Sequence, residues 1–493
     1  MLSLLSRIQD KPSYRWWIYA AIAVGTFITV VEQSATSIVV PSIAEHFGAD
    51  IPTAQWMAIA YMLSVSALMM PAGAIADSIG RKRIWVWGLL VFCCATFVTG
   101  LSQEFWMVLV GKIFMGAGAS ALQANGMAMV ASSFPDDERG KALGLHMTVV
   151  GLGAIGGPVI GGAIDSYLGW RAIFFFIAIV GVIAMVVAMT VLTPDGKKSN
   201  ENGEAIRSFD WVGTLISALF LLSLMLSITF LNKLTLSSPY IILGFLCSIL
   251  LFVGFLFREK TTNNPMLPLN LFKSVSFSLG SSSRFISFAA GSSTFFLMPF
   301  YLVSGLGLTT ALAALYLLPG AITLAIFGPI SGRIADKVGT TIPSVIGMTF
   351  SSVAMYLFSN VNLDSPLALV AIASGLSGTG MSIFMAPNTS AIMGSAGRNR
   401  YGIVSAFLNL TRNGAHVVGI AIPTAIVVSV MAGLGYEADL SDAEKLKDIG
   451  LRTAYATAMG KAFQLSTGLM IFAGLLVIIE WILNKNKSQT RAS

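Results

Sequence analysis

The stretch GAIADSIGRKR, residues 73–83, closes an apolar run with an acid, a glycine and three cations. Its first eight positions return as GRIADKVG at residues 332–339, again where an apolar run ends. Two matching segments so far apart in one chain indicate an internal repeat. The repeat predicts a molecule of two related halves, with Asp77 of the first half matched by Asp336 of the second.

The composition indicates that most of the surface faces lipid. Hydrophobic residues make up 55% of the 493 and charged residues 11%, with a mean hydropathy of +0.79, whereas an average soluble domain has about 25% charged residues. Long apolar runs recur, each near the roughly 20 residues that a helix needs to cross the hydrocarbon. Lipid-facing backbone groups must be satisfied within one segment, which excludes an isolated sheet. The sequence therefore predicts an all-α integral membrane protein.

The apolar runs predict fourteen transmembrane helices. With the N-terminus on the cytoplasmic side, most of the 30 Lys and Arg residues fall in loops on that side, which also accounts for the net charge of +7 without a nucleic-acid partner. This asymmetry places both termini in the cytoplasm and predicts a multi-pass protein of the cell (inner) membrane. The expected helices are 16–40, 52–77, 84–101, 105–132, 140–165, 171–192, 209–231, 239–257, 274–303, 309–334, 342–359, 366–394, 401–430 and 461–484.

The repeat also divides the chain into parts. Because the helix before each copy of the repeat must correspond, the first six helices match the last six and the two between them form an inserted pair. We expect a six-helix bundle at residues 1–193, a cytoplasmic linker with the inserted pair at 194–272, and a second six-helix bundle at 273–493. Internal repeats are typical of secondary transporters, whose substrate sites lie near mid-membrane between the halves.

Four stretches stand out together: VEQSATSIVVP at 31–41, GAIADSIGRKR at 73–83, LVGKIFMGAGASA at 109–121 and GLGAIGGPVIGG at 151–162. They resemble the major facilitator superfamily, and specifically its 14-helix drug:proton antiporter branch, as does FDWVG at 209–213. The resemblance covers nearly the whole chain. It implies the major facilitator fold and proton-coupled efflux by alternating access, of the kind that confers multidrug resistance.

The repeated segment carries a candidate gate. Asp77 ends a helix on the cytoplasmic side and is followed by Gly80 and Arg81, so it can hold neighbouring helices together through charge-assisted hydrogen bonds in one conformation and release them in another. Gly73 opens the same motif, and Asp336 repeats its acid. The alternative is a loop that serves only membrane topology.

The expected helix 140–165 has glycines at every fourth position. Gly153, Gly157 and Gly161 line one face and permit another helix to approach closely, while Pro158 permits a bend. We expect close helix packing there, as part of a smooth interface between the halves that seals one side and then parts.

Ionisable residues at membrane depth are costly and usually functional. Glu32 precedes Pro41 by nine residues, and Lys112 follows the outer start of its helix by about eight, so both lie roughly 12 to 14 Å below the outer boundary. We predict that they interact and that Glu32, balanced between desolvation and the lysine, carries the coupled proton. The family usually has Asp and Arg at these positions. The alternative is an ion pair that only fixes helix packing.

Arg284 and Arg412 lie at similar depth in the second half, where the sequence has no acid at comparable depth. The surroundings of Arg412 resemble the family, and we expect a structural role in which Asn409, Asn413 or helix-end carbonyls satisfy it. For Arg284 two roles stay open: contact with an anionic substrate group, or pairing with Glu32. With an adaptable apolar wall beside it, the expected substrate cavity comprises Arg284, Phe295, Phe296, Phe300, Met385 and Asn388.

Motifs for ATP use and for metalloenzymes are missing: the sequence has no G-x-x-x-x-G-K-[ST], no H-E-x-x-H and no Cys-x-x-Cys. We therefore expect no enzyme activity, no metal and no cofactor, with a proton gradient as the energy source. The leading hypothesis is export of amphipathic small molecules. Export of one endogenous lipid or metabolite, including an anionic one, is the alternative, and a non-transporting receptor is a third. Protons, the bilayer and an amphipathic or lipid substrate are the expected partners of a monomer.

Overall fold

The structure is a computed structural model that describes residues 14–134, 136–192, 210–230, 238–262, 269–396, 401–440 and 448–492. Every regular element in these ranges is helical, as the composition predicts. Three elements are short: α3 (Ile51–Ala54), the 3-10 helix η1 (Leu269–Lys273) and the π-helix η2 (Tyr301–Gly305). The long helices are α2 (Tyr14–Phe47), α4 (Trp56–Ile79), α5 (Arg81–Gly100), α6 (Phe105–Ser133), α7 (Asp136–Leu168), α8 (Trp170–Val191), α9 (Trp211–Phe230), α10 (Pro239–Thr261), α11 (Val275–Phe300), α12 (Thr310–Val338), α13 (Thr341–Ser359), α14 (Leu367–Ala396), α15 (Tyr401–Gly433) and α16 (Ile449–Ala492).

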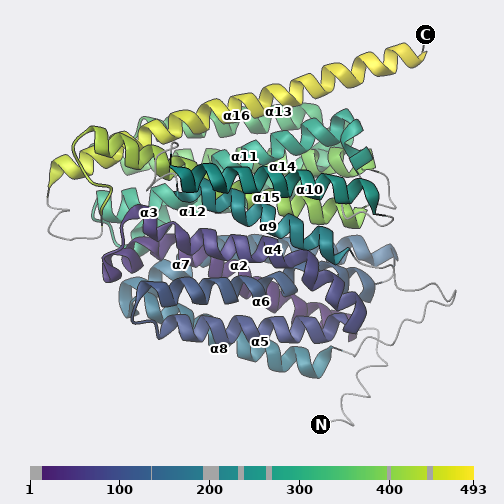
Figure 1. The fold of residues 1–493 in the computed structure, drawn as a ribbon, viewed down its shortest axis with the longest axis horizontal. Coiled ribbons are helices and arrows are strands. Elements are labelled where there is room, and N and C mark those ends of the chain that lie inside the picture. The colour runs from purple at the N-terminus through teal and green to yellow at the C-terminus, as the bar shows by residue number, and fades with distance from the viewer. Residues whose placement is uncertain are drawn as a thin grey trace.

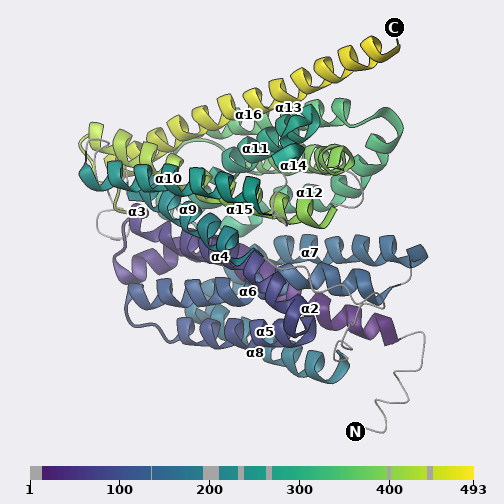
Figure 2. The same ribbon diagram turned by 45° about the vertical axis from the view of Figure 1, so that its right-hand side comes forward.

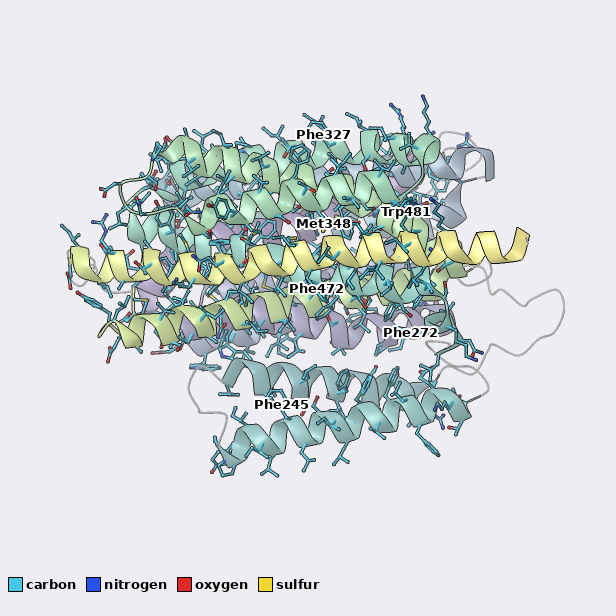
Figure 3. The ribbon with its side chains drawn as sticks, turned by 90° about the horizontal axis from the view of Figure 1, so that it is seen from above. Phe245, Phe272, Phe327, Met348, Phe472 and Trp481 are labelled. Atoms are coloured by element: carbon cyan, nitrogen blue, oxygen red, sulfur yellow. The ribbon has the colours of Figure 1, made fainter. Side chains whose placement is uncertain are left out.

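These fourteen long helices confirm the count expected from the apolar runs. Among the described residues, thirteen helices are long and apolar enough to cross a membrane, and α9 contributes a shorter apolar segment, Leu215–Leu224. Large apolar side chains lie on the outside of the bundle, such as Phe472 and Trp481 of α16, which are 49% and 48% exposed (Figure 3). An exterior of this kind suits hydrocarbon rather than water.

The helices lie side by side along one direction and form two layers (Figures 1 and 2). Helices α2 and α4 to α8, purple to blue, make one layer, and α11 to α16, green to yellow, make the other. Helices α9 and α10 pack on each other, and α9 also packs against α4 and α15. Figure 3 shows α10, marked by Phe245, at the edge of the bundle. The architecture is thus two six-helix bundles with an inserted pair, while the division of the chain at residues 193 and 272 stays a prediction.

The last helix begins earlier than expected. Helix α16 starts at Ile449 instead of residue 461, because Leu451, Tyr455 and Met459 recur at helical spacing and are all buried. The Tyr455 hydroxyl donates a hydrogen bond to the Leu297 carbonyl oxygen at 2.9 Å. The loop before α16 is correspondingly shorter than the sequence indicated.

The first helix ends later than expected. Helix α2 continues through Pro41 to Phe47, whereas the expected helix stopped at residue 40. Ile43 and Ala44 are buried, so packing of this last part against the bundle outweighs the backbone hydrogen bond that proline removes.

The internal repeat is visible in helix packing. In the first half α5 crosses α6 at Gly88, where an added Cβ would lie 3.0 Å from the Gly118 carbonyl oxygen. In the second half α13 crosses α14 at Gly347, where an added Cβ would lie 2.6 Å from the Gly380 carbonyl oxygen. Only glycine permits backbones to approach this closely. One helix crossing is therefore reproduced in both halves.

The bundle has two ends, which we call the α3 end and the Gly80 end. At the α3 end Asp50 caps α3, accepting a hydrogen bond from the Thr53 amide at 2.9 Å. At the Gly80 end, Gly80 separates α4 from α5 with φ of +106°, and Gly339 separates α12 from α13 with φ of +84°. Positive φ favours glycine, which explains why both copies of the repeat close on that residue.

Candidate functional site

Glu32 of α2 and Lys112 of α6 form a buried ion pair. Their exposed fractions are 0% and 2%, and Lys112 Nζ donates a hydrogen bond to Glu32 Oε1. The prediction that these residues lie at one depth and interact is confirmed. Either ion alone would be costly at this depth, so each residue depends on the other.

Thr36 bridges the pair. It lies one turn after Glu32 on the same face of α2, and its hydroxyl donates to Glu32 Oε1 at 2.9 Å while accepting from Lys112 Nζ at 2.8 Å. Sequence reasoning missed Thr36. The available signal was a hydroxyl four residues after a buried acid, which alone does not say whether it faces the partner helix.

The second oxygen of the Glu32 carboxylate has no hydrogen-bond partner among the described residues. Oε2 is buried, and no residue that the structure describes gives it a hydrogen bond. Aromatic rings enclose the lysine, whose Nζ lies 5.2 Å from the ring centre of Phe174 and 5.9 Å from that of Tyr61. Oε2 is thus an open hydrogen-bonding position inside an apolar enclosure, while Oε1 is bonded to both Lys112 and Thr36.

Arg284 of α11 does not pair with Glu32, so that alternative is wrong. Its side chain is 5% exposed. Nη1 donates to the Thr389 hydroxyl at 2.9 Å, and the guanidinium carbon lies 5.0 Å from the ring centre of Phe288. Nε is buried without a hydrogen-bond partner among the described residues. Both contacts of this cation are therefore with neutral groups.

Arg412 of α15 lacks the partners expected for it. Across the described ranges, no hydrogen bond joins it to Asn409, to Asn413 or to a helix-end carbonyl, and the amide nitrogen of Asn413 is itself buried without a partner. Arg412 instead lies within electrostatic range of Arg284 and of Tyr61 on α4. The side chains of Asn409, three positions before Arg412, and of Asn413, one position after it, do not turn toward the arginine, and sequence spacing alone does not determine this.

The expected aromatic wall does not form one surface. Phe296 and Phe300 are buried, with ring centres 5.4 Å apart, whereas Phe295 is 60% exposed. Helical geometry sends Phe295 and Phe296 to directions about 100° apart. Phe296 and Phe300 are core residues in this conformation, and the lining of a substrate cavity by these three residues stays a prediction.

Asn388 and Met385 of α14 lie close to Arg284. The Asn388 amide nitrogen donates to the Gly280 carbonyl oxygen at 3.0 Å and to the Ser283 hydroxyl at 3.3 Å, and its Oδ1 has no partner among the described residues. Met385 packs against a small cluster that includes Phe288. Polar and apolar groups of α11 and α14 thus surround Arg284.

The gate prediction rests on side chains that the structure leaves out. Those of Asp77 and Asp336 lie outside the described residues. Gly73 lies inside α4, in the turn before its last one, Gly80 caps the C-terminal end of α4, and Arg81 is the first residue of α5. Their role in gating stays a prediction.

The glycine face of α7 packs within one half rather than between halves. Gly153 lies against Val30, Gly157 against Ser34 and Gly161 against Ala35, all on α2. Close helix packing is thus confirmed, with Pro158 inside the continuous helix, but its place in the interface between the halves is corrected. The contact with the other half is made by Gly162, where an added Cβ would lie 2.7 Å from the Thr310 carbonyl oxygen.

A polar cluster joins the halves at the α3 end. We call it the Asp165 latch; it consists of Ser42, Asp165, Ser166 and Thr310. The Ser42 hydroxyl donates to Asp165 Oδ2 at 2.7 Å, and Thr310 of α12 also contacts this carboxylate. The hydroxyls of Ser166 and Thr310 lie 3.0 Å apart, and the Ala311 amide donates to Ser166 Oγ at 3.1 Å. Sequence reasoning missed this cluster because its members lie near helix ends, where polar residues are ordinary.

A known protein family matches most of this chain. A family model of the Major Facilitator Superfamily matches residues 22–420. The chain belongs to the Major Facilitator Superfamily. The resemblance carried by the four sequence stretches is confirmed, and the chain is a membrane transporter rather than an enzyme.

Several relatives within this superfamily transport or confer resistance to small molecules, by name. The riboflavin transporter RibZ of Clostridioides difficile is 28% identical over 474 residues, covering 96% of this chain and 99% of that protein. The tetracenomycin C resistance and export protein of Streptomyces glaucescens is 26% identical over 437 residues, with coverages of 87% and 77%. Multidrug resistance protein Stp of Mycobacterium tuberculosis is 25% identical over 415 residues, with coverages of 84% and 75%. These relatives are consistent with a drug-efflux-like branch of the superfamily.

Solved structures agree on the major facilitator fold. A bacterial homolog of the human lysosomal transporter Spinster, in an inward-facing and unoccupied conformation, superposes with a TM-score of 0.70 at 13% identity. The superposition covers 96% of this chain and 98% of that one. At this identity the likeness concerns the fold alone.

Proposed function

We propose that this Major Facilitator Superfamily transporter is a proton-coupled exporter of amphipathic small molecules. The observation that carries the proposal is the buried centre of Glu32, Thr36 and Lys112, in which one carboxylate oxygen has no partner. Relatives named for drug resistance and export support the direction and the substrate class.

Protonation of Glu32 is the proposed coupling step. A proton on Oε2 removes the negative charge that holds Lys112, so the free energy of burying this centre changes with its protonation state. A change of this kind biases a two-state equilibrium only if the two conformations differ in how they bind the proton. Alternating access provides that difference, since Glu32 is exposed to one side of the membrane and then to the other.

Two sets of contacts are the proposed gates. The Asp165 latch closes the α3 end, which the positive-inside rule places outside the cell. Asp77, Gly80, Arg81 and the repeated Asp336 close the Gly80 end, which lies in the cytoplasm with both termini. The transporter works as a monomer in the cell (inner) membrane, and no ATP or cofactor takes part.

A narrower substrate range is the second candidate. A relative that aligns along almost all of both chains is a riboflavin transporter, and this favours one endogenous amphipathic metabolite over many drugs. Riboflavin therefore belongs in the transport assay beside a fluorescent amphipathic dye.

The test is uptake into inside-out vesicles with an imposed proton gradient. We expect gradient-dependent uptake of dye or riboflavin that a protonophore abolishes and that Glu32→Gln reduces by about 100-fold, as expected when an essential proton carrier is lost. The matched control is Glu259→Gln, which makes the same change at another buried carboxylate, on α10. Uptake that persists with the protonophore, or that is equal in Glu32→Gln and the unmodified protein, would contradict the proposal.

A further inference from the structure

The membrane core of this protein carries more positive than negative charge. Among the described residues, the Asp, Glu, Lys and Arg side chains at mid-membrane depth are Glu32, Lys112, Arg284 and Arg412, and Glu32 is already paired with Lys112. The acids that the structure describes in the second half lie in loops or near the ends of helices or of their membrane spans: Asp336, Asp364, Glu437, Asp439, Asp448 and Glu480. Within the part of the chain that the structure describes, no carboxylate pairs with Arg284 or Arg412.

Arg284 is held in place by groups that do not neutralise it. Thr389 accepts from Nη1 at 2.9 Å, and the Phe288 ring lies 5.0 Å from the guanidinium carbon. The side chain is 5% exposed, and Nε is buried with no acceptor among the described residues. A buried guanidinium with an unused donor is expensive unless an acceptor arrives from elsewhere.

Arg412 brings a second cation toward the first. It lies within electrostatic range of Arg284, which repels it, and of Tyr61 on α4. The Tyr61 hydroxyl and the Asn413 amide nitrogen are both buried without hydrogen-bond partners in the described part of the chain. Donors from α4, α11 and α15 are therefore unsatisfied in the region where the two halves meet.

We propose that Arg284 and Arg412 form an oxyanion-binding site, so that the molecule bound there is an amphiphile with a carboxylate, sulfonate or phosphate group. The inference rests on the proposed transport function and names its substrate class. Guanidinium groups present paired N–H donors that match the oxygens of such anions. An anion between them replaces a repulsion with two attractions.

The same chemistry comes from two sources. A soluble anionic amphiphile enters as cargo, whereas an anionic lipid brings its headgroup from the bilayer. Both satisfy the arginines, and they differ in whether the lipid composition around the protein changes the binding of a soluble probe.

The experiment measures binding of dansylglycine and dansylglycinamide to the purified protein in phosphatidylcholine nanodiscs. These probes share one fluorophore and differ in a single negative charge. We expect dansylglycine to bind about tenfold tighter or more, the size of a charge-assisted hydrogen bond. Arg284→Met should remove that preference, so that the two probes bind with equal affinity, and Arg284→Lys should keep part of it. The control Lys461→Met removes an exposed cation of α16 and should change neither affinity.

Nanodiscs containing phosphatidylglycerol separate the two sources. Displacement of dansylglycine there identifies a lipid headgroup as the anion, and unchanged binding identifies a soluble anion. Equal affinities for the two probes, a preference that survives Arg284→Met, or no binding of either probe would each overturn the inference. If Arg284→Met does not fold, Arg412→Met provides the same comparison.

Failure here is distinguishable from failure of the proposed function, because this binding needs no proton gradient. If a neutral dye is taken up in response to the gradient but dansylglycine binds no tighter than dansylglycinamide, only the oxyanion site is contradicted. If dansylglycine binds tighter but no uptake responds to the gradient, only proton coupling is contradicted.

Discussion

Glu32 keeps its two carboxylate oxygens in different surroundings. Oε1 accepts from Lys112 and Thr36, and Oε2 is buried without a partner in the described structure. A carboxylate that is half satisfied can gain a proton without losing its existing bonds. Among single residues, Thr36 decides how firmly Oε1 is held, because its hydroxyl touches both members of the pair.

Replacing Thr36 with valine keeps the shape of the side chain and removes this hydroxyl. We expect Thr36→Val to lower the free energy of unfolding by about 1 to 3 kcal/mol, since two charged groups lose a buried hydrogen bond. Thermal unfolding in detergent checks this. The control is Thr96→Val, where the lost hydroxyl bonds only the Phe92 carbonyl oxygen. Equal losses in the two variants would show that Thr36 does not support the ion pair.

Lys112 neutralises Glu32, so removing the lysine should cost more than removing both charges. We expect Lys112→Met to destabilise the protein by about 3 to 5 kcal/mol, because Glu32 is left buried as an unpaired charge. The double variant Glu32→Gln with Lys112→Met should recover most of that loss. Unfolding of both variants in one detergent measures the difference, and additive losses would mean that the residues are not coupled.

For single residues, the sequence predicted the membrane depth of the ionisable side chains. It predicted the interaction partner correctly for one pair, Glu32 and Lys112. Counting residues from the helix ends placed Glu32 and Lys112 at one level because helix rise is constant. The same reasoning predicted Glu32 as a possible partner of Arg284, and Asn409 and Asn413 as partners of Arg412. Neither interaction is present among the described residues. Which way a long side chain turns depends on neighbours from other helices, and Thr389 lies 105 residues away from Arg284 in the chain.

Each helix forms where an apolar run is long enough to cross the bilayer, which is why all fourteen could be predicted. The start of α16 shows which helical residues the length of an apolar run does not predict. The first turns of α16 carry Arg452, Thr453 and Thr457 on one side and bury Leu451 and Tyr455 on the other. Their mean hydropathy is low, and only the helical spacing of the buried residues reveals the helix.

An ion pair between Asp210 and Arg258 joins the two inserted helices at the start of α9. Asp210 accepts from the Gly213 amide at 3.0 Å and from Arg258 Nε of α10 at 3.0 Å. Burial acts to raise the pKa of the Asp210 carboxyl, but the hydrogen bonds from Arg258 and Gly213 together hold its pKa below the ordinary value. The carboxylate thus fastens α9 to α10 while it is ionised.

This lowered pKa fixes the sign of a pH effect. The stabilisation is present above the unfolded-state pKa, about 3.9, and is lost as the pH falls through the lower folded-state value. We expect hydrogen exchange in α9 and α10 to rise on acidification below about pH 4 in the unmodified protein. Asp210→Asn should exchange faster already at pH 7 and respond less to acid. An identical acid response in both proteins would rule out this role for Asp210.

At the scale of the whole molecule, the Asp165 latch couples the two layers of helices. Ser42 and Asp165 belong to the first half and Thr310 to the second, so opening the α3 end requires that Thr310 leave Asp165 and Ser166. In the proposed alternating-access cycle, these contacts break when contacts at the Gly80 end form. The latch was not predictable, because it depends on how two halves far apart in sequence are placed.

Removing the latch hydroxyl should shift the conformational equilibrium. We expect Thr310→Val to lengthen the distance between spin labels at Tyr167 of α7 and Leu312 of α12, both exposed near the latch. The labels require a background without the native Cys93, Cys94 and Cys247. Ser37→Ala is the control, since that hydroxyl bonds only within α2. An unchanged distance distribution in Thr310→Val would contradict the latch.

The central claim is that Glu32 carries the proton that drives transport. Proteoliposomes loaded with dye or riboflavin allow proton-driven transport and exchange of external for internal substrate to be measured on one preparation. The account predicts that Glu32→Gln loses proton-driven transport and keeps substrate exchange at a rate near that of the unmodified protein, because the substituted side chain stays neutral. Proton-driven transport that survives in Glu32→Gln would contradict the claim.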